Sequence, residues 1–193
     1  MTSERSSSTA RWGQTAAAWG LLAAVVVLVI LGVQKAQSGE ARVAARLLQV
    51  ETPARVAPPF ELETLDGETV ALADLADKTV ILNFWATWCP PCVEEMPSLE
   101  ELARSFADRD DVVLLAVSTD DGWEPVRAFF EEKPPFHVLL DAEGELARQY
   151  GTTKFPETYV IEDGKITGYI IGPREWDAWY AVSFVRSLLR APS

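Results

Sequence analysis

An apolar run that leads directly into the two cysteines of the chain constrains the fold more than any other feature. Residues 79–86 read TVILNFWA, an almost continuous apolar segment that is typical of a strand buried on both faces of a sheet. Cys89 and Cys92 follow with two prolines between them, and a helical pattern extends from about Pro90 to Arg109. The sequence therefore predicts a buried strand that meets a helix at the cysteine pair.

Strand and helix patterns alternate through the rest of the domain. We expect a hairpin around Asp66-Gly67 before the central strand and a second buried strand over residues 112–118. The other predicted elements are a helix, a strand, a short helix, a hairpin and a closing amphipathic helix, over residues 125–132, 136–141, 143–151, 157–172 and 174–190. This order predicts an α/β fold with a mixed central sheet covered by helices on both faces.

The N-terminal segment is predicted to anchor the chain in a membrane. Residues 12–34 carry no charge, and about 20 apolar residues in a helix are enough to cross a bilayer core. A cleaved signal peptide is the alternative, but its apolar region is normally only about 7–15 residues long. We therefore expect a short cytoplasmic tail (1–11), a transmembrane signal-anchor helix (12–34), a linker (35–57) and one domain (58–193).

The charges beside the apolar run do not fix its orientation. Arg5 and Arg11 precede the run, whereas Lys35, Arg42 and Arg46 follow it, which slightly favours a cytoplasmic domain. Large domains that follow a first apolar segment are nevertheless translocated largely regardless of such charges. We therefore place the domain outside the cytoplasm, on the outer or periplasmic side of the cytoplasmic membrane.

The composition excludes nucleic acid as an expected partner. The formal net charge is −12, whereas binding to phosphates requires clustered lysine and arginine. The chain has one histidine, His137, on a predicted strand, and we expect no chemical role for it. We expect a monomer that needs no metal and no cofactor.

Three uses of a closely spaced cysteine pair have to be compared. A structural zinc site needs four ligands, and Cys89 and Cys92 supply two; a copper site with the distant His137 is the remaining metal option. A purely structural disulfide would close a loop of about four residues and contribute roughly 2 kcal/mol, which a domain of this size does not need. The third use is redox exchange, and the position of the pair favours it.

Redox exchange fits because the two cysteines have different positions on the predicted helix. Cys89 lies near the N-cap, where unpaired N–H groups and the helix dipole stabilise a thiolate. Cys92 lies one turn deeper, so it can resolve a mixed disulfide that Cys89 forms with a partner. Pro90 and Pro91 occupy the first turn, where a missing N–H has no consequence.

The motif FWATWCPPC resembles the active site of the thioredoxin superfamily. The longer motif WCPPCVEEMP is similar to the TlpA/ResA branch of membrane-anchored thiol-disulfide oxidoreductases, and the likeness continues through Pro97 and GTTKFPETYVIEDG. It extends from Pro58 to the C-terminus and implies a thioredoxin-like fold with an extra N-terminal β-hairpin. It also implies a reductant of extracytoplasmic proteins, for example in cytochrome c biogenesis or oxidase copper-site assembly, recharged by a membrane electron donor.

Glu95 is the candidate proton carrier. At 100° per residue it lies on the edge of the apolar helix face, one turn beyond Cys92, where partial burial raises the pKa of a carboxyl group. The resemblance implies the same role, whereas the alternative is an acid that only complements the helix dipole. Asn83 occupies a strand position that often holds an acid in thioredoxin-like proteins, and an amide cannot take up a proton.

The remaining candidate residues form an expected docking rim for partner proteins. The resemblance implies that Pro156 is a cis proline packed against the cysteines, which leaves the backbone of Phe155 to pair with an extended segment. Trp88, Pro90 and Pro91 are expected to border Cys89 as an apolar surface. A peroxiredoxin-like thiol peroxidase and a copper metallochaperone remain the alternatives, and the motif does not determine the direction of electron flow.

Overall fold

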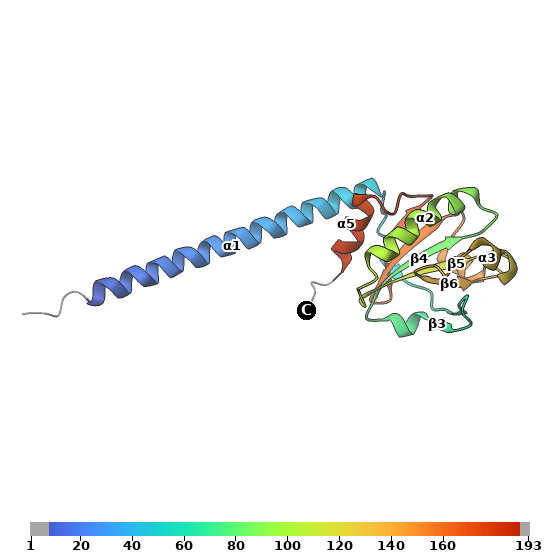
Figure 1. Ribbon diagram of the computed structural model, residues 1–193, viewed down its shortest axis with the longest axis horizontal. Coiled ribbons are helices and arrows are strands. Elements are labelled where there is room, and N and C mark those ends of the chain that lie inside the picture. Colours follow the sequence, from blue (N-terminus) through green and yellow to red (C-terminus); the bar gives the residue numbers. More distant parts are fainter. Residues whose placement is uncertain (1–7, 190–193) are drawn as a thin grey trace, which may run out of the picture. The chain divides into compact units, whose positions relative to one another are not determined.

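The apolar run forms the central strand of a mixed sheet. In the computed structural model, which describes residues 8–189, this strand is β4 (Thr79–Trp85), and every side chain on it is buried. The six-stranded sheet has the order β1-β8-β7-β4-β5-β6, with β4, β5 and β6 parallel and β7 antiparallel to β4 (Figure 1). The other strands of this sheet are β1 (Arg55–Val56), β5 (Val112–Ser118), β6 (His137–Leu140), β7 (Glu157–Glu162) and β8 (Lys165–Ile171). The predicted mixed sheet is confirmed.

Alternation along β4 divides the core between the two faces of the sheet. Ile81 and Trp85 belong to one buried cluster, and Val80, Leu82 and Phe84 belong to the other. The helices are α2 (Pro90–Ser105), α3 (Trp123–Phe129), α4 (Glu145–Tyr150) and α5 (Trp179–Leu188). Helices α2, α3 and α5 contribute side chains to the first cluster and α4 to the second, so both faces of the sheet are covered as predicted.

The expected extra hairpin precedes β4. Strands β2 (Glu61–Glu63) and β3 (Thr69–Ala71) pair antiparallel around the predicted turn, where Gly67 has a positive φ of 83°. A short 3₁₀ helix, η1 (Leu72–Leu75), follows β3. The hairpin forms a separate two-stranded sheet.

The closing helix is shorter than its periodicity suggests. It begins at Trp179 and not near residue 174, and Trp176 lies in the preceding loop with 1% of its surface exposed. The backbone N–H of Trp176 donates to Ser98 Oγ and its indole N–H donates to Glu95. The apolar spacing that predicted a longer helix therefore reflects burial of a loop residue.

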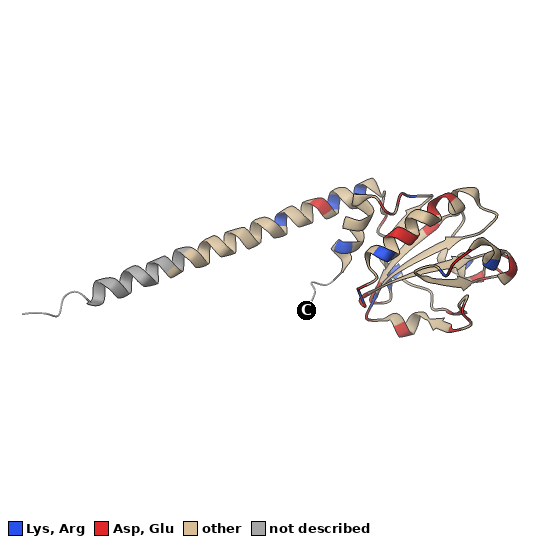
Figure 2. Cartoon of the chain, viewed as in Figure 1, with Lys and Arg blue, Asp and Glu red and all other residues tan. Residues whose placement is uncertain are grey.

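Helix α1 (Ser8–Leu47) contains the apolar run, and its segment Leu22–Leu47 is long and apolar enough to cross a membrane. Its side chains from Leu22 to Leu31 are exposed. Figure 2 shows this stretch without charged residues and, within the coloured part of α1, places the charges toward its C-terminal end. Residues 1–7 of the expected tail lie outside the described residues.

The compact unit that contains the sheet begins at Ala41, earlier than the expected boundary at residue 58. Ala44 and Leu48 are fully buried in the core on the α2 face. Glu51 and Tyr169 exchange two backbone hydrogen bonds of 2.8 Å, and β1 pairs with β8. The second half of the predicted linker therefore covers the outer edge of β8, which would otherwise present unpaired backbone groups.

Candidate active site

The cysteine pair lies at the point where the loop after β4 enters α2. Cys89 and Cys92 form a disulfide with their Cα atoms 5.3 Å apart. Cys89 is the N-cap residue of α2, and its carbonyl oxygen accepts hydrogen bonds from the backbone N–H groups of Cys92 (3.0 Å) and Val93 (3.1 Å). Cys89 retains 5% exposure, whereas Cys92 has none. Cys89 is therefore the outer residue of the pair and Cys92 the inner one.

A buried aspartate fixes the loop that presents Cys89. The carboxylate of Asp120 accepts hydrogen bonds from the backbone N–H of Thr87 (3.0 Å), from Thr87 Oγ1 (2.6 Å) and from Ser118 Oγ (2.7 Å). Asp120 is 2% exposed and follows the end of β5, the parallel neighbour of β4. The carboxyl end of one strand thus holds the turn that leaves the adjacent strand.

Glu95 lies on the buried face of α2, one turn beyond Cys92. It is 3% exposed, and its two carboxylate oxygens receive three hydrogen bonds. Oε1 accepts from Asn83 Nδ2 (2.9 Å), and Oε2 accepts from the backbone N–H of Arg174 (3.0 Å) and from Trp176 Nε1 (3.1 Å). Burial raises the pKa of Glu95 from its ordinary value of 4.5 to about 7, against the opposing effect of these donors and of the Arg174 charge.

Asn83 and Glu95 are direct partners. Strand alternation places Asn83 on the same face of the sheet as Ile81 and Trp85, which is the face covered by α2. Its amide nitrogen also donates to Thr158 Oγ1 (3.0 Å) on β7, while its Oδ1 atom has no hydrogen-bond partner among the described residues. Asn83, at the strand position where an acid was the alternative, therefore contacts the acid Glu95 of α2.

The Phe155–Pro156 peptide bond is cis, as the resemblance implied, and Pro156 is buried. The carbonyl oxygen of Pro156 accepts a hydrogen bond from the backbone N–H of Gly172 (2.8 Å). Glu157, 1% exposed, accepts hydrogen bonds from the backbone N–H of Lys154 (3.1 Å) and from Tyr159 OH (3.0 Å). These contacts fix the loop that carries Phe155 and Pro156.

The predicted rim brings two loops together. The Trp88 side chain is 61% exposed, and its ring lies 5.7 Å from the Phe155 ring in an edge-to-face contact. Trp88 belongs to the cysteine loop and Phe155 to the loop with the cis peptide bond. Pro90 is exposed and Pro91 is half-buried, and both follow Cys89 in the sequence. The contact between Trp88 and Phe155 therefore links the cysteine loop to the loop with the cis peptide bond.

The sequence did not reveal Asp120, Glu157, Arg174 or Trp176 as part of this site. Asp120 and Glu157 carry a usable signal, because Asp120 closely follows the apolar strand β5 and Glu157 is the first residue of the buried strand β7. Arg174 carries no such signal, since it contacts Glu95 through its backbone across 79 positions in the chain.

Comparisons with known proteins agree with this geometry. A family model described as the AhpC/TSA family matches residues 53–169. The thioredoxin-like protein YneN of Bacillus subtilis is 40% identical over 109 residues, which cover 55% of this chain and 64% of YneN. The thiol-disulfide oxidoreductase ResA of Bacillus cereus is 36% identical over 118 residues, which cover 60% of this chain and 68% of that protein. The match thus spans a little less than two thirds of YneN and a little more than two thirds of ResA.

Solved structures share the fold over most of their length. A thiol:disulfide interchange protein DsbE from Chlorobium tepidum has a TM-score of 0.63 and 26% identity, covering 71% of this chain and 96% of its own. StoA from Bacillus subtilis has a TM-score of 0.55 and 30% identity, covering 63% of this chain and 92% of its own. The chain therefore belongs to the AhpC/TSA family, and it is similar to thioredoxin-like thiol-disulfide oxidoreductases of the ResA and StoA type.

Proposed function

We propose that this chain is an extracytoplasmic thiol-disulfide oxidoreductase that reduces disulfides in partner proteins through Cys89 and Cys92. The observation that carries the proposal is the disulfide at the first turn of α2, with the buried Glu95 one turn further along the helix. Similarity to ResA and StoA supports this chemistry. The proposed partners include proteins of cytochrome c maturation or oxidase copper-site assembly, together with a membrane electron donor that returns the pair to the dithiol.

The first step is nucleophilic attack by Cys89 in the reduced protein. Its thiolate attacks one sulfur of the partner disulfide, the partner S–S bond breaks, and the second partner sulfur leaves as a thiolate. The product is a mixed disulfide between Cys89 and the partner. Cys89 is suited to this step because it is the more exposed sulfur and lies at the positive end of the α2 dipole.

The second step is resolution by Cys92. The Cys92 thiol transfers its proton to Glu95, and the resulting thiolate attacks Cys89 Sγ. This attack breaks the mixed disulfide, and the partner sulfur that was bonded to Cys89 leaves as a thiolate. Two electrons have then moved to the partner, and the Cys89–Cys92 disulfide has formed. A carboxyl group with a pKa of about 7 can accept and later release a proton near neutral pH.

The partner segment is proposed to dock along the Phe155–Pro156 loop. An extended segment would pair with the backbone of Phe155 by strand addition. The exposed Trp88 ring and the neighbouring Pro90 and Pro91 would contact its apolar side chains. This arrangement would present the partner disulfide to Cys89.

The anchor helix supports a location at the cytoplasmic membrane. The apolar stretch within Leu22–Leu47 satisfies the length and composition of a single membrane span. We propose that the domain faces the periplasm or extracytoplasmic space, where partner disulfides form and persist.

Trapping of partners tests the proposed function. Cys92→Ala in the full-length chain leaves Cys89 without a resolving thiol, so partners remain attached to it as mixed disulfides that a reductant releases. Cys89→Ala is the matched control and should retain none of them. Absence of any reductant-sensitive partner on Cys92→Ala in the native cell would contradict the proposal.

Three further measurements separate the proposed reductant from its alternatives. A reduction potential well above about −150 mV would exclude a reductant, since dithiol pairs at that end of the range act as oxidants. Rapid consumption of peroxide by Cys92→Ser, with a sulfenate at Cys89, would indicate a thiol peroxidase. Stoichiometric binding of Cu(I) to the reduced chain would indicate a copper metallochaperone.

A further inference from the structure

The loop that joins β8 to α5 supplies most of the hydrogen bonds to Glu95. We refer to residues 172–176 as the capping loop. Its Arg174 backbone N–H and Trp176 indole N–H both donate to Glu95 Oε2, at 3.0 and 3.1 Å. The third donor, Asn83, contacts the other oxygen and comes from β4. The position of the capping loop therefore determines whether Glu95 Oε2 receives its two hydrogen bonds.

The capping loop is tied at both ends to the proposed active site. The backbone N–H of Gly172 donates to the Pro156 carbonyl oxygen (2.8 Å), next to the cis peptide bond. The backbone N–H of Trp176 donates to Ser98 Oγ (3.1 Å) on α2, and this hydroxyl, which donates to the Glu95 carbonyl oxygen (2.8 Å), also lies 3.3 Å from the Arg174 carbonyl oxygen. The side chain of Arg174 attaches the loop to a third segment, the end of α1.

The Arg174 side chain extends from the capping loop to the C-terminal end of α1. Its Nε donates to the Leu48 carbonyl oxygen (3.1 Å), and its Nη2 donates to Gln49 Oε1 (3.1 Å). Gln49 has a positive φ of 57°, as is typical of the residue that ends a helix, and Leu48 is fully buried. A guanidinium at this position satisfies a carbonyl left unpaired at the helix end and complements the helix dipole.

We propose that Arg174 is a positioning residue that couples the end of the anchor helix to proton transfer at the cysteine pair. By holding the capping loop against Leu48 and Gln49, it keeps two N–H donors on Glu95. The proposal rests on the proposed role of Glu95, which accepts the Cys92 proton. Changes at Leu48 and Gln49 are then transmitted through the Arg174 side chain to Glu95 and the dithiol.

The direction of the effect follows from the groups that face Glu95. Asn83 on β4, Trp176 and the Arg174 backbone donate hydrogen bonds, the Arg174 guanidinium adds a positive charge, and Cys92 lies one turn away on the same helix. All of the donors and the guanidinium favour the carboxylate, whereas burial and a Cys92 thiolate favour the protonated acid. Loss of the Arg174 side chain removes its charge and loosens two donors, so the pKa of Glu95 rises.

The test compares Arg174→Gln with a second arginine variant in the oxidised full-length chain. Infrared titration of the protonated carboxyl band, assigned with Glu95→Gln, measures the midpoint for Glu95. We expect Arg174→Gln to raise this midpoint by roughly half a pH unit or more. Arg174→Lys should restore part of the shift, because it keeps the charge but not the fork that reaches both acceptors.

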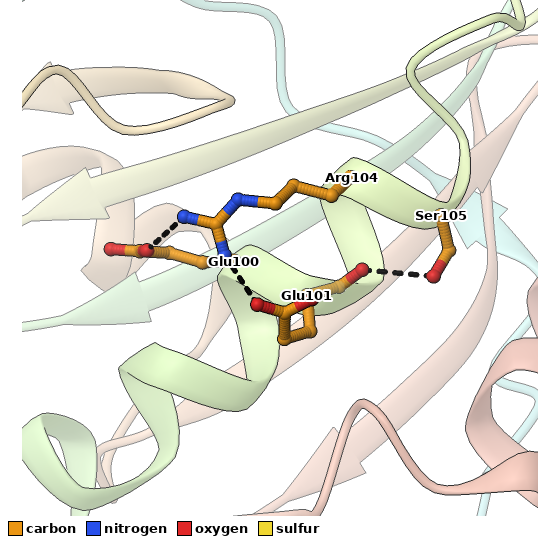
Figure 3. A network of polar contacts seen from close by, with 4 residues as sticks. All are labelled: Glu100, Glu101, Arg104 and Ser105. Atoms are coloured by element: carbon orange, nitrogen blue, oxygen red, sulfur yellow. Dashed lines mark hydrogen bonds and ion pairs between the residues drawn. The ribbon is translucent and has the colours of Figure 1, made fainter.

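Arg104→Gln is the matched control. Arg104 lies on α2, the same helix as Glu95, but it pairs with Glu100 (2.8 Å) and Glu101 (2.6 Å) on the exposed face, as Figure 3 shows. Its replacement should leave the Glu95 midpoint unchanged. An equal shift of the Glu95 midpoint in Arg174→Gln and Arg104→Gln would overturn the proposal. The shift would then follow from the loss of any positive charge and not from the position of Arg174.

An unchanged midpoint in a folded Arg174→Gln protein would reduce Arg174 to a structural contact and refute the coupling. If Arg174→Gln does not fold, the same titration is made on Gln49→Ala. A Glu95 midpoint above the wild-type value supports the coupling, and an unchanged midpoint overturns it. Failure of the proposed function is seen separately, as a Glu95→Gln protein that exchanges disulfides at the wild-type rate. The midpoint shift does not depend on that rate, so the two failures are distinguishable.

Discussion

The two faces of helix α2 place two glutamate side chains, Glu95 and Glu101, in opposite environments. On the buried face, Glu95 has little contact with solvent and is surrounded by hydrogen-bond donors, and its pKa rises to about 7. On the outer face, the Glu101 side chain is 59% exposed and forms an ion pair with Arg104 (Figure 3). The comparison teaches that burial raises the pKa of Glu95 into the range where it can exchange protons near neutral pH. An exposed ion pair, such as that of Glu101, provides no comparable burial.

The largest expected difference concerns stability as a function of pH. Because burial raises the pKa of Glu95 from 4.5 to about 7, the folded protein keeps this proton at pH values where the unfolded chain has released it. Because the unfolded chain ionises first, stability is fully present below about pH 4.5, is lost progressively as the pH rises from there through about 7, and falls no further above it. The total loss is about 3 kcal/mol in the free energy of unfolding.

Denaturant unfolding of the oxidised chain at several pH values measures this effect. Glu95→Gln should remove the loss of stability between acidic and mildly alkaline pH, and Glu101→Gln should retain it. If both variants kept the wild-type pH dependence, the two faces would not differ in the way that burial predicts.

The next effect is on the rate of exchange. Glu95→Gln cannot accept the Cys92 proton, so we expect the release of a thiol from a mixed disulfide at Cys89 to slow about a hundredfold at neutral pH. Stopped-flow release of a chromophoric thiol measures this step. Glu101→Gln, the same change on the outer face, should leave the rate unchanged, and an equal loss in both would argue against a specific role for Glu95.

A second carboxyl group at position 83 sharpens the comparison further. Asn83→Asp places an acid at the position from which the amide now donates to Glu95 at 2.9 Å. Two adjacent carboxylates resist ionising together, so the upper pKa of the pair should rise by about one unit or more. The pH profile of the exchange rate should move upward accordingly. Asn83→Ala, which only removes the donor, should move it less.

The smallest effect is expected on the outer face. Arg104→Ala breaks the contacts to Glu100 and Glu101, and solvent screens exposed pairs of this kind so that they contribute little to stability. The free energy of unfolding should therefore barely change, with the exchange rate unaffected. Thermal unfolding at low and high salt checks this, because a larger loss would show that the outer pairs stabilise α2.

Local patterns predicted the parts of the fold and site that depend on neighbours in the sequence. Strand runs and helix periodicity located β4, β5 and the buried face of α2, so helical spacing was enough to place Glu95 at the apolar face of the helix. The start of α2 followed from Pro90 and Pro91. These features depend on residues within one or two turns, where spacing alone determines which face a side chain occupies.

Contacts between distant segments were not predictable in the same way. Nothing in the composition of residues 41–57 distinguishes a free linker from one that packs its small apolar side chains into a core. Arg174 lies 126 positions from Leu48, and its backbone reaches Glu95 only because the capping loop is hydrogen-bonded to α2. The periodicity around Trp176 suggested helix because burial in a loop produces the same apolar spacing.

The disulfide has a practical consequence for observation in the cell. The chain contains two cysteines, and both belong to the Cys89–Cys92 bridge. Alkylation of the whole protein therefore has three countable products, with no label, one label or two, which correspond to the oxidised, partner-bound and dithiol forms. A mass-shift gel of unmodified protein from living cells thus reports the fraction of the population in each stage of the cycle, without background from any other thiol of the chain.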